Sequence, residues 1–187
     1  MYKSEIESYI NKEIDVLKAL DISSIDAVMT AIMDAYNNDA NIYIFGNGGS
    51  AATASHFQND FNKGISEHVD KKFNFVCLND NVPTVMAIAN DSGYEYIFEH
   101  QLLGKLKQND LVIAISGSGN SENVIRAIDY ANLQGNKTVG VTGYDGGKLA
   151  KIVDISFNVP INDMQITEDV HMVLDHLMMS VLMRKLS

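Results

Sequence analysis

The chain has 187 residues, of which 46% are hydrophobic and 20% are charged, a balance typical of one globular domain and not of a disordered chain. Its formal net charge is -10 at pH 7, which argues against nonspecific binding to nucleic acid or to an anionic membrane surface, because both require basic patches. No apolar run reaches the roughly 18 residues of a membrane span, and the first residues lack the continuous apolar core of a signal peptide.

The first 38 residues predict two amphipathic helices, at 3–20 and 22–38. Apolar residues recur in the first of them at spacings of three and four, among them Ile6, Ile10 and Ile14. Such a stripe would be a liability if it stayed exposed on a monomer. We therefore expect the N-terminal helices to pack between subunits.

Apolar, strand-like runs alternate with helical stretches through the rest of the chain. The expected strands are 41–45, 73–78, 110–115, 137–142 and 153–159, and the expected helices lie near 50–63, 83–90, 95–106, 121–134 and 165–186. This order predicts an α/β fold with a doubly wound, five-stranded parallel sheet and helices on both faces. No linker or repeat is visible, so we expect one domain over 1–187, with oligomerisation helices in 1–38 and a ligand-binding core in 39–187.

One cysteine, Cys77, lies in the apolar run FNFVCL. A single thiol excludes an internal disulfide and fits a reducing environment, so we expect a cytoplasmic protein. The apolar neighbours of Cys77 favour a buried structural thiol over a nucleophile.

Two loops rich in glycine and serine follow strands of the predicted sheet. Gly46-Asn47-Gly48-Gly49-Ser50 follows the first strand, and Ser116-Gly117-Ser118-Gly119-Asn120-Ser121 follows the third. In a doubly wound sheet, ligands bind at the carboxyl ends of strands, where helix N-termini offer unpaired amides. Serine hydroxyls add donors that need no charge, which suits phosphate on an acidic protein. The alternative is two ordinary turns with serine and asparagine as helix caps, but both loops hold more glycine and serine than a cap needs.

Two familiar nucleotide motifs fit the first loop poorly. A Walker A loop requires Gly-Lys-Ser or Gly-Lys-Thr, which is absent. Gly46, Gly48 and Ala51 match the dinucleotide fingerprint, but that motif also requires an acid about 20 residues further on. The next strand ends at Asn79-Asp80, about a dozen residues too late, so a nucleotide is disfavoured.

Candidate acid–base and metal-ligating residues lie on two predicted helices. His56 and Asp60 are four residues apart and share a helix face. Glu168 and His176 are eight apart, roughly 80° around the helix axis, and can also converge. Nitrogen and oxygen ligands without a soft thiolate suit Zn²⁺. The alternative is that both carboxylates only cap helices or form salt bridges, and His171, roughly 140° from His176, is expected to be a core histidine.

The segments GNGGSAATASHF, ISGSGNSENVIRAI, VTGYDGGKLA and ITEDVHMVLDHLM resemble the sugar isomerase (SIS) domain. More narrowly they resemble phosphoheptose isomerases, and the similarity covers nearly the whole chain. The resemblance implies a flavodoxin-like fold, a homotetramer and active sites at subunit interfaces. It also implies isomerisation of sedoheptulose 7-phosphate to D-glycero-D-manno-heptose 7-phosphate through an enediol.

The resemblance further implies roles for individual residues. The residues expected to cradle the sugar phosphate are Ser116, Gly117, Ser118 and Ser121, and those expected to contact the sugar are Asn47, Gly48, Gly49, Ser50, Asp91 and Glu168. One Zn²⁺ per active site would be bound by His56, Asp60, Glu168 and His176. Asp60 and His176 would serve as the acid–base pair.

Three positions depart from the family pattern. Asp60 stands in place of a glutamate, Glu168 in place of a glutamine, and Gln165 in place of an aspartate. Two imidazoles with two carboxylates would make a zinc site neutral, which favours firm binding but polarises a substrate oxygen less. Two alternatives therefore stay open: an isomerase of a different sugar phosphate, and a non-catalytic SIS protein that binds sugar phosphates or associates with a replication initiator.

Overall fold

A single sheet of five parallel strands organises the chain. The computed structural model describes residues 1–186 and orders the strands β2-β1-β3-β4-β5. The strands are β1 (Ile42–Gly46), β2 (Phe75–Cys77), β3 (Leu111–Ser116), β4 (Lys137–Gly143) and β5 (Ile155–Val159). The predicted α/β class with a five-stranded, doubly wound parallel sheet is confirmed, and the strand order is that of flavodoxin-like folds.

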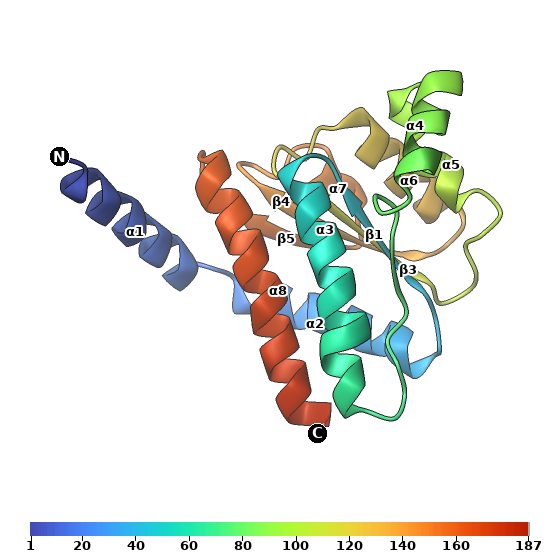
Figure 1. Ribbon diagram of the computed structural model, residues 1–187, viewed down its shortest axis with the longest axis horizontal. Coiled ribbons are helices and arrows are strands. Elements are labelled where there is room, and N and C mark those ends of the chain that lie inside the picture. The colour runs from blue at the N-terminus through green and yellow to red at the C-terminus, as the bar shows by residue number, and fades with distance from the viewer. Residues whose placement is uncertain (187) are drawn as a thin grey trace.

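Helices connect the strands and cover both faces of the sheet (Figure 1). The α-helices are α1 (Lys3–Lys18), α2 (Ile22–Asn37), α3 (Gly49–Asn59), α4 (Val82–Asp91), α5 (Glu99–Leu102), α6 (Glu122–Leu133), α7 (Leu149–Ile152) and α8 (Met164–Leu186). Short π or 3-10 segments are η1 (Asp60–Ile65), η2 (Ser66–His68) and η3 (Tyr94–Tyr96). None of the helices within residues 1–186 is long and apolar enough to cross a bilayer.

The expected helix at 95–106 is wrong. That segment forms η3, the four-residue α5 and a turn. The helix ends at Leu103, whose backbone is extended, and Gly104 then adopts a φ of 67°. A left-handed residue cannot continue a right-handed helix, so the helix ends before Gly104. The apolar pattern in the sequence extends further, which is why the predicted helix was too long.

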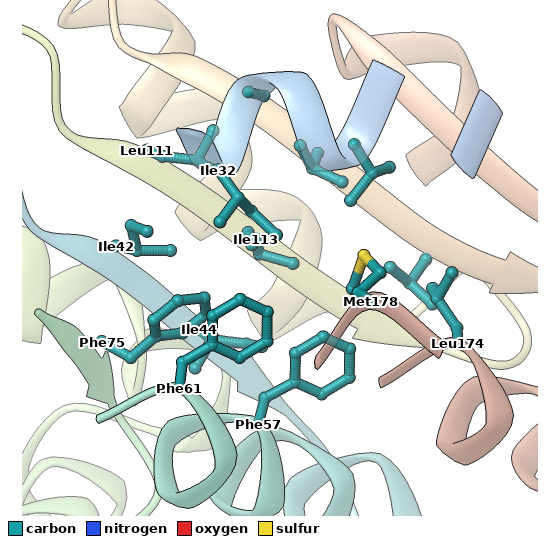
Figure 2. Packing of buried hydrophobic residues seen from close by; sticks show 14 of the residues in the cluster. Ile32, Ile42, Ile44, Phe57, Phe61, Phe75, Leu111, Ile113, Leu174 and Met178 are labelled. Atoms are coloured by element: carbon teal, nitrogen blue, oxygen red, sulfur yellow. The ribbon is translucent and has the colours of Figure 1, made fainter. Parts of the chain in front are cut away.

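The larger hydrophobic core lies between the sheet and the helices α2, α3 and α8, with η1. Side chains alternate along β1, so Ile42 and Ile44 face this core while Tyr43 and Phe45 face the core beneath α5, α6 and α7. Figure 2 shows residues from α3, η1 and α8 meeting on one face of the sheet; these are Phe57, Phe61, Leu174 and Met178, packed around Ile44 and Ile113. This packing holds α3 and α8 side by side on one face of the sheet (Figure 1).

The two N-terminal helices are both present, but they differ in what covers them. The apolar residues of α2, among them Ile25, Val28 and Ile32, are buried against the sheet of the same chain. No residue of α1 is buried, and this helix projects away from the body (Figure 1). Two polar contacts join α1 to the region of α8: Tyr9 donates a hydrogen bond to Asp169, and Lys12 pairs with Asp163 at 2.6 Å.

Cys77 ends β2 with its side chain buried. Burial raises the pKa of the thiol to about 12, so almost no thiolate forms near neutral pH. The prediction of a buried, unreactive structural thiol is confirmed.

Candidate active site

The two glycine- and serine-rich loops lie at the point where the strand order reverses. β1 and β3 are neighbours, and the chain continues from β1 toward β2 on one side and from β3 toward β4 on the other. The connections therefore diverge, leaving a crevice at the carboxyl ends of these strands, where doubly wound proteins bind ligands. Both predicted loops thus border one ligand-binding position.

The first loop is held by Asn79, which follows β2. Its amide donates to the Gly46 carbonyl at 2.9 Å and accepts from the Gly46 amide at 3.2 Å. Gly48 caps α3 with a φ of 56°, a left-handed conformation that favours glycine. Gly49 begins the helix, and Ser50 in its first turn is buried. The loop therefore presents the N-terminus of α3 toward the crevice.

The serine loop, Ser116–Ser121, is held by hydrogen bonds within the loop and by close packing against the connection between β4 and α7. The Ser116 hydroxyl accepts from the Gly119 amide at 3.2 Å, and the Ser118 hydroxyl accepts from the Asn120 amide at 3.3 Å. Gly119 has a φ of 63°, and a Cβ there would lie 2.1 Å from the Gly146 carbonyl oxygen, so no larger residue fits. Ser121 occupies the N-cap of α6, but its side chain makes no capping hydrogen bond. A simple helix cap therefore does not explain Ser121.

A pair of asparagines joins the two loops. Asn47 and Asn123 exchange amide hydrogen bonds, each 2.9 Å long, and the Tyr94 hydroxyl donates to Asn47 Oδ1 at 2.8 Å. These three residues and Ser121 line an open pocket of about 580 Å³. Sequence reasoning missed Asn123 and Tyr94, because a single amide or phenol produces no periodic signal.

Arg126 adds a cation to the wall of this pocket. Its Nε donates to Glu99 Oε2 at 2.9 Å, and its guanidinium lies 4.4 Å from the centre of the Tyr96 ring. Glu99 neutralises the charge of Arg126, so the pocket supplies mainly uncharged donors, as the acidic composition had led us to expect.

Two histidines and an aspartate converge between α3 and α8. His56 Nε2 lies 3.2 Å from His176 Nε2 and 3.5 Å from Asp60 Oδ2, and His176 Nε2 lies 3.9 Å from the same oxygen. Asp60 is 8% exposed and stands where α3 passes into the π-helix η1. Such π segments occur frequently at functional sites. The predicted convergence of His56, Asp60 and His176 is what the structure shows.

Asp175 is a fourth member of this group that sequence reasoning missed. One ligand atom from each of His56, Asp60, Asp175 and His176 can be chosen so that all lie within 4.8 Å of one another. Burial, and then the nearby Asp60 carboxylate, raise the pKa of Asp175 to about 8. The available signal was an acidic residue at a helix position flanked by the core residues Leu174 and Met178.

Glu168, the remaining predicted metal ligand, lies outside this group. Its carboxylate covers Gly49, where an added Cβ would meet Oε1 at 2.5 Å. The step of eight positions from Glu168 to His176 leaves the two side chains roughly 80° apart around the helix axis and also advances the helix by about 12 Å. The structure therefore brings together three of the four predicted ligands and places Glu168 at the first loop, where its predicted contact with the sugar is feasible.

Asp91 ends α4 and is exposed, with its carboxylate accepting a hydrogen bond from Asn90 at 2.7 Å. Its predicted contact with the sugar stays a prediction. His171, by contrast, is 1% exposed, and its Nε2 lies 3.0 Å from the Thr142 carbonyl oxygen on β4. Burial lowers the pKa of His171 to about 4. His171 is a core histidine, as expected.

Comparison with known proteins decides the family. The model of the SIS domain matches residues 7–143. The chain is 31% identical over 178 residues to a probable phosphoheptose isomerase from Thermoplasma volcanium, covering 95% of this chain and 90% of that one. It is 36% identical over 155 residues to the phosphoheptose isomerase of Aliarcobacter butzleri, covering 83% and 82%. The chain belongs to the phosphoheptose isomerases of the SIS domain family.

The fold of this family is shared in detail. The solved phosphoheptose isomerase from Neisseria gonorrhoeae matches with a TM-score of 0.89 at 26% identity, covering 97% of this chain and 98% of that one. The resemblance inferred from four sequence segments is confirmed.

We predict that His171 makes this family member sensitive to acid. Its pKa is about 4 in the folded chain and 6.5 when unperturbed, so below pH 6.5 the unfolded state binds more protons. The stability from the neutral imidazole is therefore present above that value and is lost as the pH falls toward 4. Between about pH 7 and about pH 4.5 the contribution of His171 alone should fall by about 2–3 kcal/mol, whereas Asp175, with its raised pKa, changes the stability in the opposite direction.

Urea unfolding in metal-free buffer measures this loss. His171→Gln, which keeps a neutral donor, should lose less stability over the same pH range than the unmodified chain. The same substitution at the exposed His68 is the control and should change nothing. Equal acid sensitivity in His171→Gln and the unmodified chain would contradict the prediction.

Proposed function

We propose that the chain is a cytoplasmic aldose–ketose isomerase that converts sedoheptulose 7-phosphate to D-glycero-D-manno-heptose 7-phosphate. The observation that carries this proposal is the convergence of His56, Asp60 and His176, with His56 on the helix α3 that the first loop begins. The curated relatives at 31% and 36% identity are named phosphoheptose isomerases, which supports the same substrate class.

The reaction moves a proton between neighbouring carbons through an enediol, so it needs a base within hydrogen-bond reach and a means to stabilise the oxyanion. The His176 side chain is 59% exposed and can reach a substrate, whereas that of Asp60 is 11% exposed. In our proposal these two residues transfer the proton, and the mostly buried Asp60 also holds both imidazoles in place. A general acid–base pair of this kind contributes roughly 10²- to 10⁴-fold to the rate.

The same residues suit a divalent metal ion. Two imidazole nitrogens and carboxylate oxygens lie within one coordination-sized space, and none of the cluster ligands is a thiolate, which fits Zn²⁺. When bound, the ion would polarise the ketose oxygen and stabilise negative charge on it. His56, Asp60 and His176 would hold the ion, and Glu168 at Gly49 would contact the sugar.

The phosphate end of the substrate is assigned to the serine loop. Ser118 and Ser121 are partly exposed, and the N-terminus of α6 directly follows them. The backbone amide of Gly117 would complete the anion site, while the Gly119 amide, paired with Ser116, braces the turn. The sugar would then extend toward Asn47, Gly48, Gly49 and Ser50 in the first loop.

Turnover should depend on both zinc and His176. The metal-stripped chain should be inactive on sedoheptulose 7-phosphate and should recover with one equivalent of Zn²⁺. His176→Ala should lose zinc and at least about 100-fold of kcat, since one side chain would serve both roles. Metal content and initial rates are measured together, with His68→Ala as the matched control.

Three outcomes would count against parts of this proposal. Full activity after metal removal would assign proton transfer to Asp60 and His176 without zinc. Turnover of another sugar phosphate, but not of the heptose, would move the assignment to a different substrate. Tight binding of the heptose phosphate without turnover would favour the non-catalytic alternative.

Removal of the serine hydroxyls should weaken substrate binding. We expect Ser118→Ala combined with Ser121→Ala to raise KM at least about 100-fold, because each of the two hydrogen bonds to a charged group contributes about 1.5–3 kcal/mol. Circular dichroism should show an intact fold, and Ser23→Ala at an exposed position of α2 is the control. An unchanged KM for a phosphorylated sugar would reject the serine loop as the phosphate site.

We also propose that the chain forms a homotetramer with active sites at subunit interfaces. The apolar stripe of α1 supports association, since Ile6, Ile10 and Ile14 are 57%, 49% and 41% exposed within one chain. Ile10→Asp should therefore lower the mass of the particle in analytical ultracentrifugation at micromolar concentration. Leu133→Asp on α6, also highly exposed, should leave the mass unchanged. An unmodified chain that sediments as a monomer would contradict the proposal.

A further inference from the structure

Asp175 is a buried carboxylate without a hydrogen-bond partner. It lies on α8 beside His176 and is 0% exposed. Neither of its carboxylate oxygens has a hydrogen-bond partner among residues 1–186. Buried polar groups in native proteins are nearly always hydrogen-bonded, and buried charges are paired or coordinate a metal. Hydrophobic packing alone does not account for a carboxylate at this position.

The neighbours of Asp175 determine what could satisfy it. A carboxylate oxygen of Asp175 lies within 4.8 Å of ligand atoms of His56, Asp60 and His176. Asp60 is itself 8% exposed, so two nearly buried carboxylates share one small space. Within residues 1–186, the ion pairs of Asp60 are with the two imidazoles, and Asp175 forms none. The group that would satisfy this cluster is a cation at its centre.

We propose that Asp175 is a direct ligand of the divalent cation, completing a set with His56, Asp60 and His176. The inference rests on the metal site of the proposed function and gives the fourth position to Asp175 rather than to Glu168. Two nitrogens and two oxygens are ligand types that Zn²⁺ takes, and the ketose oxygen would enter as a fifth ligand, an expansion that catalytic zinc allows. Two carboxylates also balance the charge of the ion, which makes its burial between α3 and α8 less costly.

The competing explanation is that Asp175 is a neutral carboxylic acid of the core. That state removes the repulsion with Asp60 but leaves the hydroxyl and carbonyl of the acid without partners among the described residues. The two explanations differ in what the side chain does for metal binding. A ligand raises the affinity for the ion, whereas a neutral core residue affects the stability of the fold and leaves the affinity unchanged.

The test uses the full chain, stripped of metal, with Asp175→Asn and Asp175→Leu as variants. Asp129→Asn, the same change at an exposed position of α6, is the control. Zn²⁺ affinity is measured by competition with a chromophoric chelator. The absorption spectrum of the Co²⁺-substituted chain reports the ligand set, and melting temperatures are recorded with and without Zn²⁺.

We expect both Asp175 variants to bind Zn²⁺ at least about 10- to 100-fold more weakly, since even indirect partners of metal ligands contribute that much. The Co²⁺ spectrum should change, and the increase in melting temperature on adding Zn²⁺ should shrink. Without metal, Asp175→Leu should melt higher than the unmodified chain, because it removes an unsatisfied buried carboxylate. Asp129→Asn should match the unmodified chain in every measurement.

Unchanged Zn²⁺ affinity and an unchanged Co²⁺ spectrum in Asp175→Asn would overturn the proposal, whatever the melting temperatures show. Asp175→Asn nearly preserves size and shape, so the test does not depend on whether Asp175→Leu folds. If the unmodified chain does not bind Zn²⁺, both the assignment of Asp175 and the metal site of the proposed function are overturned. The proposed function fails in a different way. In that case the chain binds zinc normally but does not turn over the heptose phosphate.

Discussion

The packing of α3 and η1 against α8 is the constraint on which the site depends. Phe57 and Phe61 come from one side and Leu174 and Met178 from the other, and all four are buried on the same face of the sheet (Figure 2). Apolar burial contributes about 25 cal/mol per Å², so this contact is expensive to disturb. His56 and Asp60 immediately flank Phe57 and Phe61 in sequence, and Asp175 and His176 lie between Leu174 and Met178. The core therefore positions both halves of the cluster.

The sheet topology positions the other part of the candidate site, the two loops that follow β1 and β3. Because β1 and β3 are neighbours and their connections diverge, two loops distant in sequence meet at one edge. The Asn47–Asn123 pair then fixes the first loop to the start of α6, so the proposed phosphate and sugar contacts would have a defined separation. Rigid placement of this kind matters because a misplacement near 1 Å can cost on the order of 100-fold in rate.

An acidic chain that binds a phosphorylated sugar faces an electrostatic problem, since its net charge of -10 repels the ligand. The structure meets this with local donors. The serine hydroxyls, the amides at the start of α6 and the paired Arg126 offer hydrogen bonds without requiring a positive surface. The carboxylates Asp60 and Asp175 lie instead between α3 and α8, where two imidazoles and a cation would compensate them.

Much of this could be predicted from the sequence. Alternating apolar strands and amphipathic helices determined the α/β class and the parallel sheet, because burial on both faces of a sheet requires that pattern. The loops Gly46–Ser50 and Ser116–Ser121 were recognisable from composition, and the i, i+4 spacing placed His56 with Asp60. The expectation that a lone histidine on an apolar helix belongs to the core was right for His171, whereas His176 was singled out by the family resemblance.

Only the tertiary structure decided which residues of α3 and α8 face each other, and at what height along the helices. Periodicity gives the angle of a side chain around its helix but not its partner on another helix, so it could not test the ligand role that the family resemblance implied for Glu168. The helix rise places Glu168 about 12 Å from His176 along the axis, whereas Asp175, one residue from His176, turns inward to the same space. Its unsatisfied carboxylate becomes visible only when the surrounding core is in place, because burial is a property of the packed chain and not of its sequence.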